Sequence, residues 1–130
     1  YDRLELIKKY EKIYFILLDN EDRTIQISKN VYNFKKEIIN DVSQSLPNSY
    51  LISSQNFKNQ INKLEGIDII YPNVGENLDF MAKISKENQL KTNYLYREID
   101  LFCWQYCQKG FFNFKKNIPF ILNEIRNKHL

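Results

Sequence analysis

The chain has 130 residues, of which 43% are hydrophobic and 15% aromatic, and its net charge is +3 at pH 7. A chain of this length can bury one hydrophobic core, so we expect residues 1–130 to form a single domain. It contains no apolar run of the roughly 20 residues that cross a bilayer and no secretory signal pattern, which predicts a cytoplasmic protein without membrane contact. Because the chain starts at Tyr1 rather than Met, we infer that it is processed or excised from a longer protein.

The N-terminal part of the chain predicts an antiparallel β-hairpin. Residues 2–12 have the spacing of a short helix, and residues 13–18 form a wholly apolar run typical of a buried strand. A polar turn over residues 19–23 and the alternating Ile25 and Ile27 complete the hairpin. We interpret the three acidic side chains of this turn as turn residues rather than as a cation site.

Two helices are predicted after the hairpin. In the first, apolar residues recur every three or four positions and are expected to face the core. These residues are Val31, Phe34, Ile38, Val42 and Leu46. Ser28 or Asn30 can cap the start of this helix and Pro47 ends it, while the second helix ends at Gly66.

After Gly66, the sequence predicts a strand followed by helices. Residues 67–71 are β-branched and bounded by Pro72, which favours a third strand. A helix follows over about residues 76–85. The last helix is expected to begin at Pro119, because the missing N–H of proline costs nothing in a first helical turn.

The stretch over residues 94–110 contains both cysteines and the only tryptophan. As a helix it is apolar on nearly every side, which is typical of a helix buried at the centre of a domain. Alternatively, Arg97, Leu101 and Trp104 form an exposed patch that contacts a protein partner. Asp100 lies at the edge of the apolar stripe, where its carboxylate needs an ion-pair partner, and Arg97 or a lysine elsewhere in the chain could provide it.

Metal, cofactor and enzyme signatures are absent from the sequence. Cys103, Cys107 and the single histidine, His129, are too few for a four-ligand zinc site, and the cysteines are expected to be small buried hydrophobic residues. There is no glycine-rich phosphate loop and no nucleophile motif. We therefore expect no cofactor and favour a function without catalysis.

Residues 71–84, YPNVGENLDFMAKI, contain a turn that leads into a helix. Tyr71, Pro72, Val74 and Gly75 followed by an apolar helix resemble the turn of the helix-hairpin-helix motif of DNA repair glycosylases. The resemblance covers residues 71–100. It implies that the backbone N–H groups at Val74 and Gly75 hold a DNA phosphate, and that Asp100 is the catalytic aspartate. The alternative is a plain turn that starts a helix.

Positive charge is concentrated near the C-terminus, where residues 101–130 have a net charge of +4. Within them, the stretch KGFFNFKKN alternates cations with phenylalanines, a pattern that single-strand binding proteins use to meet phosphates and stack bases. The residues concerned are Lys109, Phe111, Phe112, Phe114, Lys115 and Lys116. Alternatively, these phenylalanines fold inward as core and the lysines only solvate a loop between two helices.

The sequence thus predicts an α+β fold, in which a small antiparallel β-hairpin, extended to three strands by residues 67–71, packs against four or five helices. The predicted function is a non-catalytic nucleic-acid-binding module that contacts DNA or RNA through its basic, aromatic C-terminal segment. The alternatives are a protein–protein interaction domain of a larger assembly and a DNA-processing enzyme of helix-hairpin-helix type.

Overall fold

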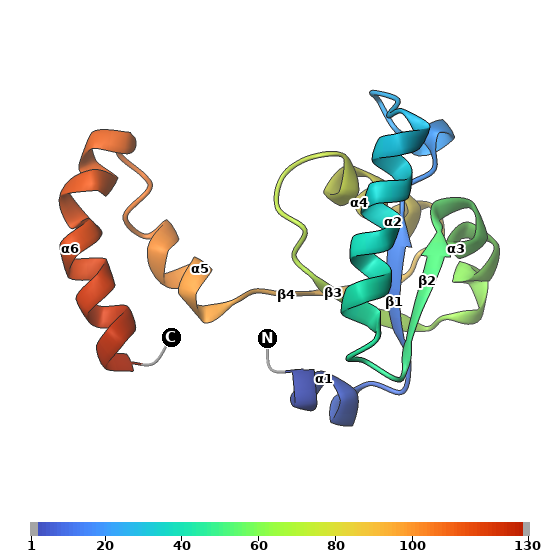
Figure 1. The fold of residues 1–130 in the computed structure, drawn as a ribbon, viewed down its shortest axis with the longest axis horizontal. Helices are drawn as coiled ribbons and strands as arrows, with labels where there is room; N and C mark the ends of the chain where they lie inside the picture. The colour runs from blue at the N-terminus through green and yellow to red at the C-terminus, as the bar shows by residue number, and fades with distance from the viewer. Residues whose placement is uncertain (1–2, 129–130) are drawn as a thin grey trace. The chain divides into compact units, whose positions relative to one another are not determined.

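The protein has an α/β architecture, which corrects the predicted α+β fold. The computed structural model describes residues 3–128, and within them six α-helices accompany two parallel two-stranded sheets (Figure 1). The chain divides into two compact units, Tyr1–Asn93 and Tyr94–Leu130, each with its own packing. The helices are α1 (Arg3–Lys9), α2 (Lys29–Ser43), α3 (Ser54–Gln60), α4 (Glu76–Glu87), α5 (Glu98–Trp104) and α6 (Phe111–Lys128). The strands are β1 (Ile13–Leu17), β2 (Ser49–Ser53), β3 (Gly66–Ile70) and β4 (Lys91–Leu95).

The sheet of the first unit is formed by β1 and β2. The two strands run parallel, in register from Ile13 opposite Ser49 to Leu17 opposite Ser53. Strands β3 and β4 pair in a second parallel sheet. The strand and the helix predicted over residues 67–71 and 76–85 are confirmed by β3 and α4.

The predicted antiparallel hairpin over residues 13–27 is wrong. After β1 the chain forms a short 3-10 turn, η1 (Asn20–Asp22), and then enters α2 without a second strand. Ile25, expected to point inward, has 77% of its surface exposed. A strand that is apolar on both faces is typical of a parallel sheet covered by helices on both sides, and β1 finds that environment next to β2.

Helix α2 begins as predicted but presents a different face to the sheet. Ser28 caps it by accepting a hydrogen bond from the backbone N–H of Val31 (3.3 Å). However, the predicted core residues Val31, Phe34 and Ile38 are exposed. A sheet of two five-residue strands is too narrow to cover the apolar stripe of a fifteen-residue helix, and none of the residues of α2 is fully buried.

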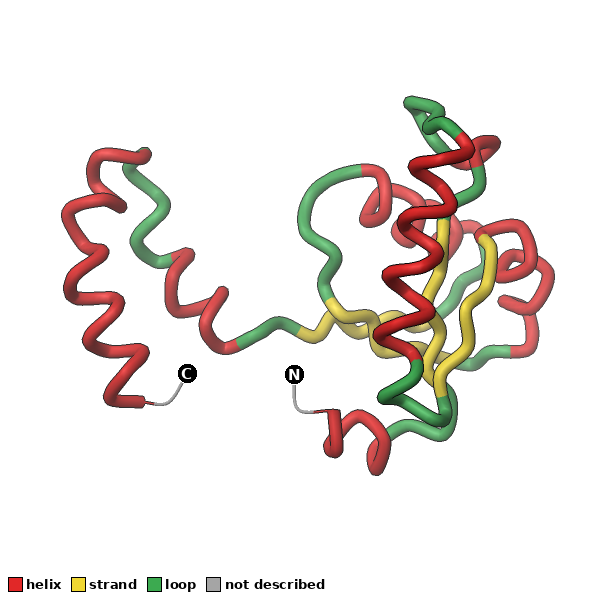
Figure 2. The backbone as a smooth tube through the Cα atoms, viewed as in Figure 1, coloured by secondary structure: helices red, strands yellow, loops and turns green. Residues whose placement is uncertain are grey.

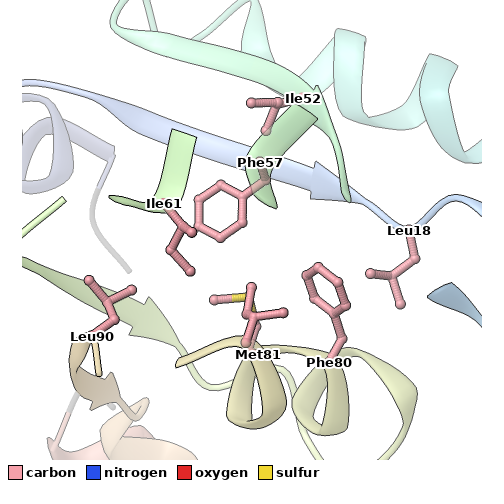
Figure 3. Close-up of a cluster of buried hydrophobic side chains, with 8 residues drawn as sticks. Leu18, Ile52, Phe57, Ile61, Phe80, Met81 and Leu90 are labelled. Carbon is pink, nitrogen blue, oxygen red and sulfur yellow. The ribbon is translucent and has the colours of Figure 1, made fainter. Parts of the chain in front are cut away.

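The hydrophobic core lies on the other side of the β1–β2 pair from α2. Figure 3 shows side chains of α3 and α4 facing one another below the strands, with Phe57 near the centre. The buried cluster consists of Leu18, Ile52, Phe57, Ile61, Phe80, Met81, Ile84 and Leu90. Helix α3 continues as a 3-10 turn, η2 (Ile61–Lys63), and Gly66 begins β3 instead of ending the helix.

The second unit is a helical hairpin formed by α5 and α6 (Figure 2). The rings of Tyr106 and Phe120 lie 6.0 Å apart, and Lys128 Nζ lies 5.2 Å from the ring centre of Phe102. None of the residues of α5 is buried. The expectation of a buried central helix over residues 94–108 is therefore wrong, because the core is built by α3 and α4.

Helix α6 begins eight residues before the predicted start at Pro119, which lies inside the helix. Proline cannot donate a hydrogen bond to the carbonyl four residues earlier, that of Lys115. Lys115 is exposed, so water can reach this region of the helix. Gly110, with φ of 83°, precedes the helix in a conformation that favours glycine.

None of the helices between residues 3 and 128 has the length and apolar character needed to cross a membrane.

We predict that Phe57→Ala lowers the free energy of unfolding by about 3–5 kcal/mol, because it leaves a cavity among tightly packed neighbours. Phe57 is 2% exposed, whereas Phe34 on α2 is 63% exposed. Phe34→Ala is the matched control and should change the free energy by less than about 1 kcal/mol. Urea unfolding followed by circular dichroism measures both. Equal losses in the two variants would contradict the assignment of the core to α3 and α4.

Candidate functional site

Helix α6 has one continuous exposed face. At 100° per residue, this face spans less than half of the helix circumference and extends from its first turn to its last. Its residues are Phe111, Phe112, Lys115, Lys116, Pro119, Leu122, Asn123 and Arg126, all of them exposed. Lys115 follows Phe111 by four residues and Lys116 follows Phe112 by four, so each lysine lies one helical turn from an aromatic ring.

The exposed face of α6 is positively charged. The only acidic residue of the helix, Glu124, lies on the opposite side, where it forms an ion pair with Lys128 (2.9 Å). Lys115, Lys116 and Arg126 form no ion pair with any residue between 3 and 128. The exposed face therefore contains three cations and no carboxylate.

Two phenylalanines at the start of α6 are exposed to solvent. Phe111 and Phe112 have 68% and 77% of their surface exposed, and their ring centres are 5.6 Å apart in an edge-on arrangement. Phe114 is half-buried on the other side of the helix, and Lys109 is exposed in the turn before it. The interpretation of all three phenylalanines as core is therefore wrong for the first two.

The predicted contact patch on α5 is also exposed. Leu101 and Trp104 are 47% and 39% exposed, and the indole of Trp104 packs edge-on against Tyr96 at 5.8 Å. Arg97 forms two hydrogen bonds of 2.7 Å with Asp100, which confirms the predicted ion pair. These bonds hold the pKa of Asp100 below its usual value. Both oxygens of the Asp100 carboxylate thus accept hydrogen bonds from Arg97.

Residues 71–75 form a turn between a strand and a helix. Val74 is 86% exposed, and Gly75 has φ of 136° at the N-cap of α4. Asn73, at φ of 63°, also adopts the left-handed region. The turn follows β3, whereas the turn of a helix-hairpin-helix motif joins two helices.

A buried polar network joins the ends of β1 and β2, and the sequence did not indicate it. The hydroxyl of Ser54, fully buried, accepts a hydrogen bond from the backbone N–H of Asp19 (2.8 Å) and donates to the Asp22 carboxylate (2.6 Å). Lys58 forms an ion pair with the same carboxylate. The acidic turn is the sequence signal for this network, and we interpreted its side chains as turn residues rather than as partners of α3.

Asp22 is ionised within this network. Its burial favours the neutral acid, but hydrogen bonds from Lys58 and Ser54 and the charge of the lysine outweigh that effect, so its pKa is lowered. Each charged group of the network has a partner of opposite charge or a hydrogen bond. The network therefore stabilises the junction between the strands and α3.

The cysteines differ in their accessibility. Both are free thiols, with Cys103 half-buried and Cys107 exposed, so the prediction of two buried cysteines is wrong for Cys107. Burial raises the pKa of Cys103. Among residues 3–128 no group of three or more His, Cys, Asp or Glu side chains could hold a metal ion, and His129 lies outside the described residues.

The chain matches no protein-family model, and comparison with curated proteins and with solved structures likewise gives no match.

We predict that Asp22→Asn lowers the free energy of unfolding at pH 7 by about 1.5–3 kcal/mol, the range for hydrogen bonds to charged groups. Because the pKa of Asp22 is lowered by folding, the unfolded chain binds more protons in acid. The stabilisation is complete above the ordinary value of 3.8 and is lost as the pH falls through the folded pKa.

Urea unfolding between pH 2.5 and 7 measures this effect, with Asp41→Asn on the exposed side of α2 as the control. The difference in free energy of unfolding between wild type and Asp22→Asn should disappear in acid. The corresponding difference for Asp41→Asn should stay small at every pH. If the free energy of unfolding of Asp22→Asn differs from that of wild type by the same amount at every pH, the ionised carboxylate does not stabilise the fold.

Proposed function

We propose that this protein is a non-catalytic module that binds single-stranded nucleic acid through the exposed face of α6. The observation that carries the proposal is the combination of three cations, two exposed phenylalanines and no carboxylate on one helix face. Ordinary solvated helices mix charges of both signs on their exposed side. A face with positive charge alone attracts a polyanion over a length of about 23 Å.

The phosphate contacts are assigned to Lys115, Lys116 and Arg126. Since these side chains have no internal ion-pair partner among the described residues, binding a phosphate breaks no existing ion pair. Lys109, just before the helix, can add a fourth contact. Each phosphate that is neutralised releases condensed counterions, so the affinity should depend steeply on salt.

The base contacts are assigned to Phe111 and Phe112. An exposed aromatic ring gains by stacking on a base, and every base has a face that can stack. Bases in a duplex already stack on one another, so free bases of a single strand are the better ligands. The first backbone N–H groups of α6 have no acceptor within the helix and favour an anion near the same residues.

We predict that the double variant Lys115→Glu, Lys116→Glu abolishes binding of a labelled single-stranded oligonucleotide. The measurement is fluorescence anisotropy with DNA and RNA at two or more salt concentrations. For wild type, the logarithm of affinity should fall with the logarithm of salt by about 0.7 per phosphate contact.

The matched control for the charge reversal is Lys29→Glu, Lys36→Glu, which changes two exposed lysines of α2 in the first unit. It has the same net charge as the test variant, so a general charge effect would weaken both equally. Equal weakening, or an unchanged affinity of the α6 variant, would overturn the assignment to α6.

We predict that Phe112→Ala weakens binding by about 1–3 kcal/mol without changing the salt dependence, because it removes stacking and no charge. The same titrations measure this, with Phe34→Ala as the control for loss of an exposed phenylalanine. A reduced salt dependence in Phe112→Ala would mean that the ring positions the lysines instead of stacking on bases.

A second candidate function is a protein–protein interaction domain in which Arg97, Leu101 and Trp104 contact the partner. It is favoured by the exposure of Leu101 and Trp104 on α5, because tryptophan and arginine dominate many interfaces. The same titrations separate the two functions. If neither DNA nor RNA binds at low salt, the nucleic-acid proposal fails and this second function is preferred.

A further inference from the structure

The first unit contains a cleft at the carboxyl end of β1, lined by residues that have no part in the function proposed above. Its volume is about 230 Å³. The walls come from the end of β1 and from α2, and a few polar side chains line one side. The lining residues are Ile16, Leu17, Leu18, Arg23, Lys35, Ile38, Ile39 and Asn77.

Arg23 is the buried charged group of this cleft. Its side chain is only 2% exposed. Its Nε donates to the backbone carbonyl of Leu18 (3.1 Å), and Nη1 donates to the carboxylate of Glu76. These two bonds fix the guanidinium, while Nη2 donates to no other residue between 3 and 128. A buried guanidinium with unused donors at a cleft wall favours an anionic acceptor.

The other polar groups around the cleft add positive charge. Lys35 is exposed on α2 and forms no ion pair with another described residue. Asn77 lies in the first turn of α4, whose N-cap, Gly75, provides no side-chain hydrogen bond. The positive end of the α4 dipole therefore lies beside the cleft. Glu76 forms an ion pair with Arg23, whereas Lys35 has no ion-pair partner among the described residues and contributes an uncompensated positive charge.

The position of the cleft in the fold is one that α/β proteins use for ligands. Helix α2, which follows β1, lies on one side of the β1–β2 pair, and α3, which follows β2, packs with the core on the other side (Figures 1 and 3). Ligands of parallel α/β sheets bind beyond the carboxyl ends of the strands, and this cleft lies at that end of β1.

We propose that this cleft binds a small organic anion, with its carboxylate or phosphate held by Arg23 and Lys35 and a short apolar body against Leu17 and Ile38. The apolar walls exclude a bare inorganic ion as the best ligand, because they gain nothing from it. The volume lies below the range of about 300–1,000 Å³ that is usual for drug-sized ligands, which limits the body to a size near that of one ring. This site is independent of nucleic-acid binding by α6.

The test is a titration of the full chain with benzoate, phenyl phosphate and neutral benzamide, followed by two-dimensional NMR of backbone amides. At least one of the two anions should shift the amides of Leu18, Lys35 and Asn77, and benzamide should shift them at least about tenfold more weakly. The anion that binds more tightly shows whether the site prefers a carboxylate or a phosphate. The proposal is overturned if neither anion shifts these amides, or if benzamide shifts them equally.

The matched variants are Lys35→Glu and Lys36→Glu, which are adjacent on α2 and both exposed, while only Lys35 lines the cleft. Lys35→Glu should weaken the binding of the anion about fivefold or more, and Lys36→Glu should stay within about twofold. Arg23→Gln should abolish binding, but it also removes a buried ion pair. If Arg23→Gln fails to fold, the comparison of Lys35→Glu with Lys36→Glu still tests the site. Equal affinities of these two variants for the anion would reject it.

Discussion

The parallel pairing of β1 with β2 is the constraint on which the first unit depends. Residues 13–18 are apolar without alternation, so β1 must be covered on both faces. A parallel neighbour requires a crossover connection, which α2 provides on one face, and the chain then returns through α3 and α4 on the other. Burial of Phe57, Phe80 and Ile84 on that second face gives the unit its core.

Polar groups at the carboxyl ends of the two strands then join the layers. Ser54 connects the loop after β1 to the start of α3, and Lys58 holds Asp22 from the next turn of that helix. The ion pair between Arg23 and Glu76 connects the same loop to α4. Removing one partner of a buried pair leaves an uncompensated charge, so these contacts fix the orientation of α4 as well as the edge of the cleft.

Local patterns predicted several elements, and non-local pairing explains where prediction failed. The cap at Ser28, strand β3, helix α4 and the Arg97–Asp100 pair depend on residues close in sequence, and all four are present. The partner of β1 lies more than thirty residues away, and nothing near residues 13–18 specifies it. The basic segment was recognised from composition alone. The sequence did not predict that this segment forms one exposed helix face, because proline is typical of a first helical turn and Pro119 instead lies inside α6.

The two thiols of the second unit make the chain selectively reactive. Thiolate is the nucleophilic form of cysteine, and burial of Cys103 disfavours it, whereas Cys107 is open to solvent three residues before Gly110. An alkylating dye at neutral pH should therefore attach first to Cys107. The native sequence thus provides a position for a fluorescent reporter beside the first turn of α6, without any engineered cysteine.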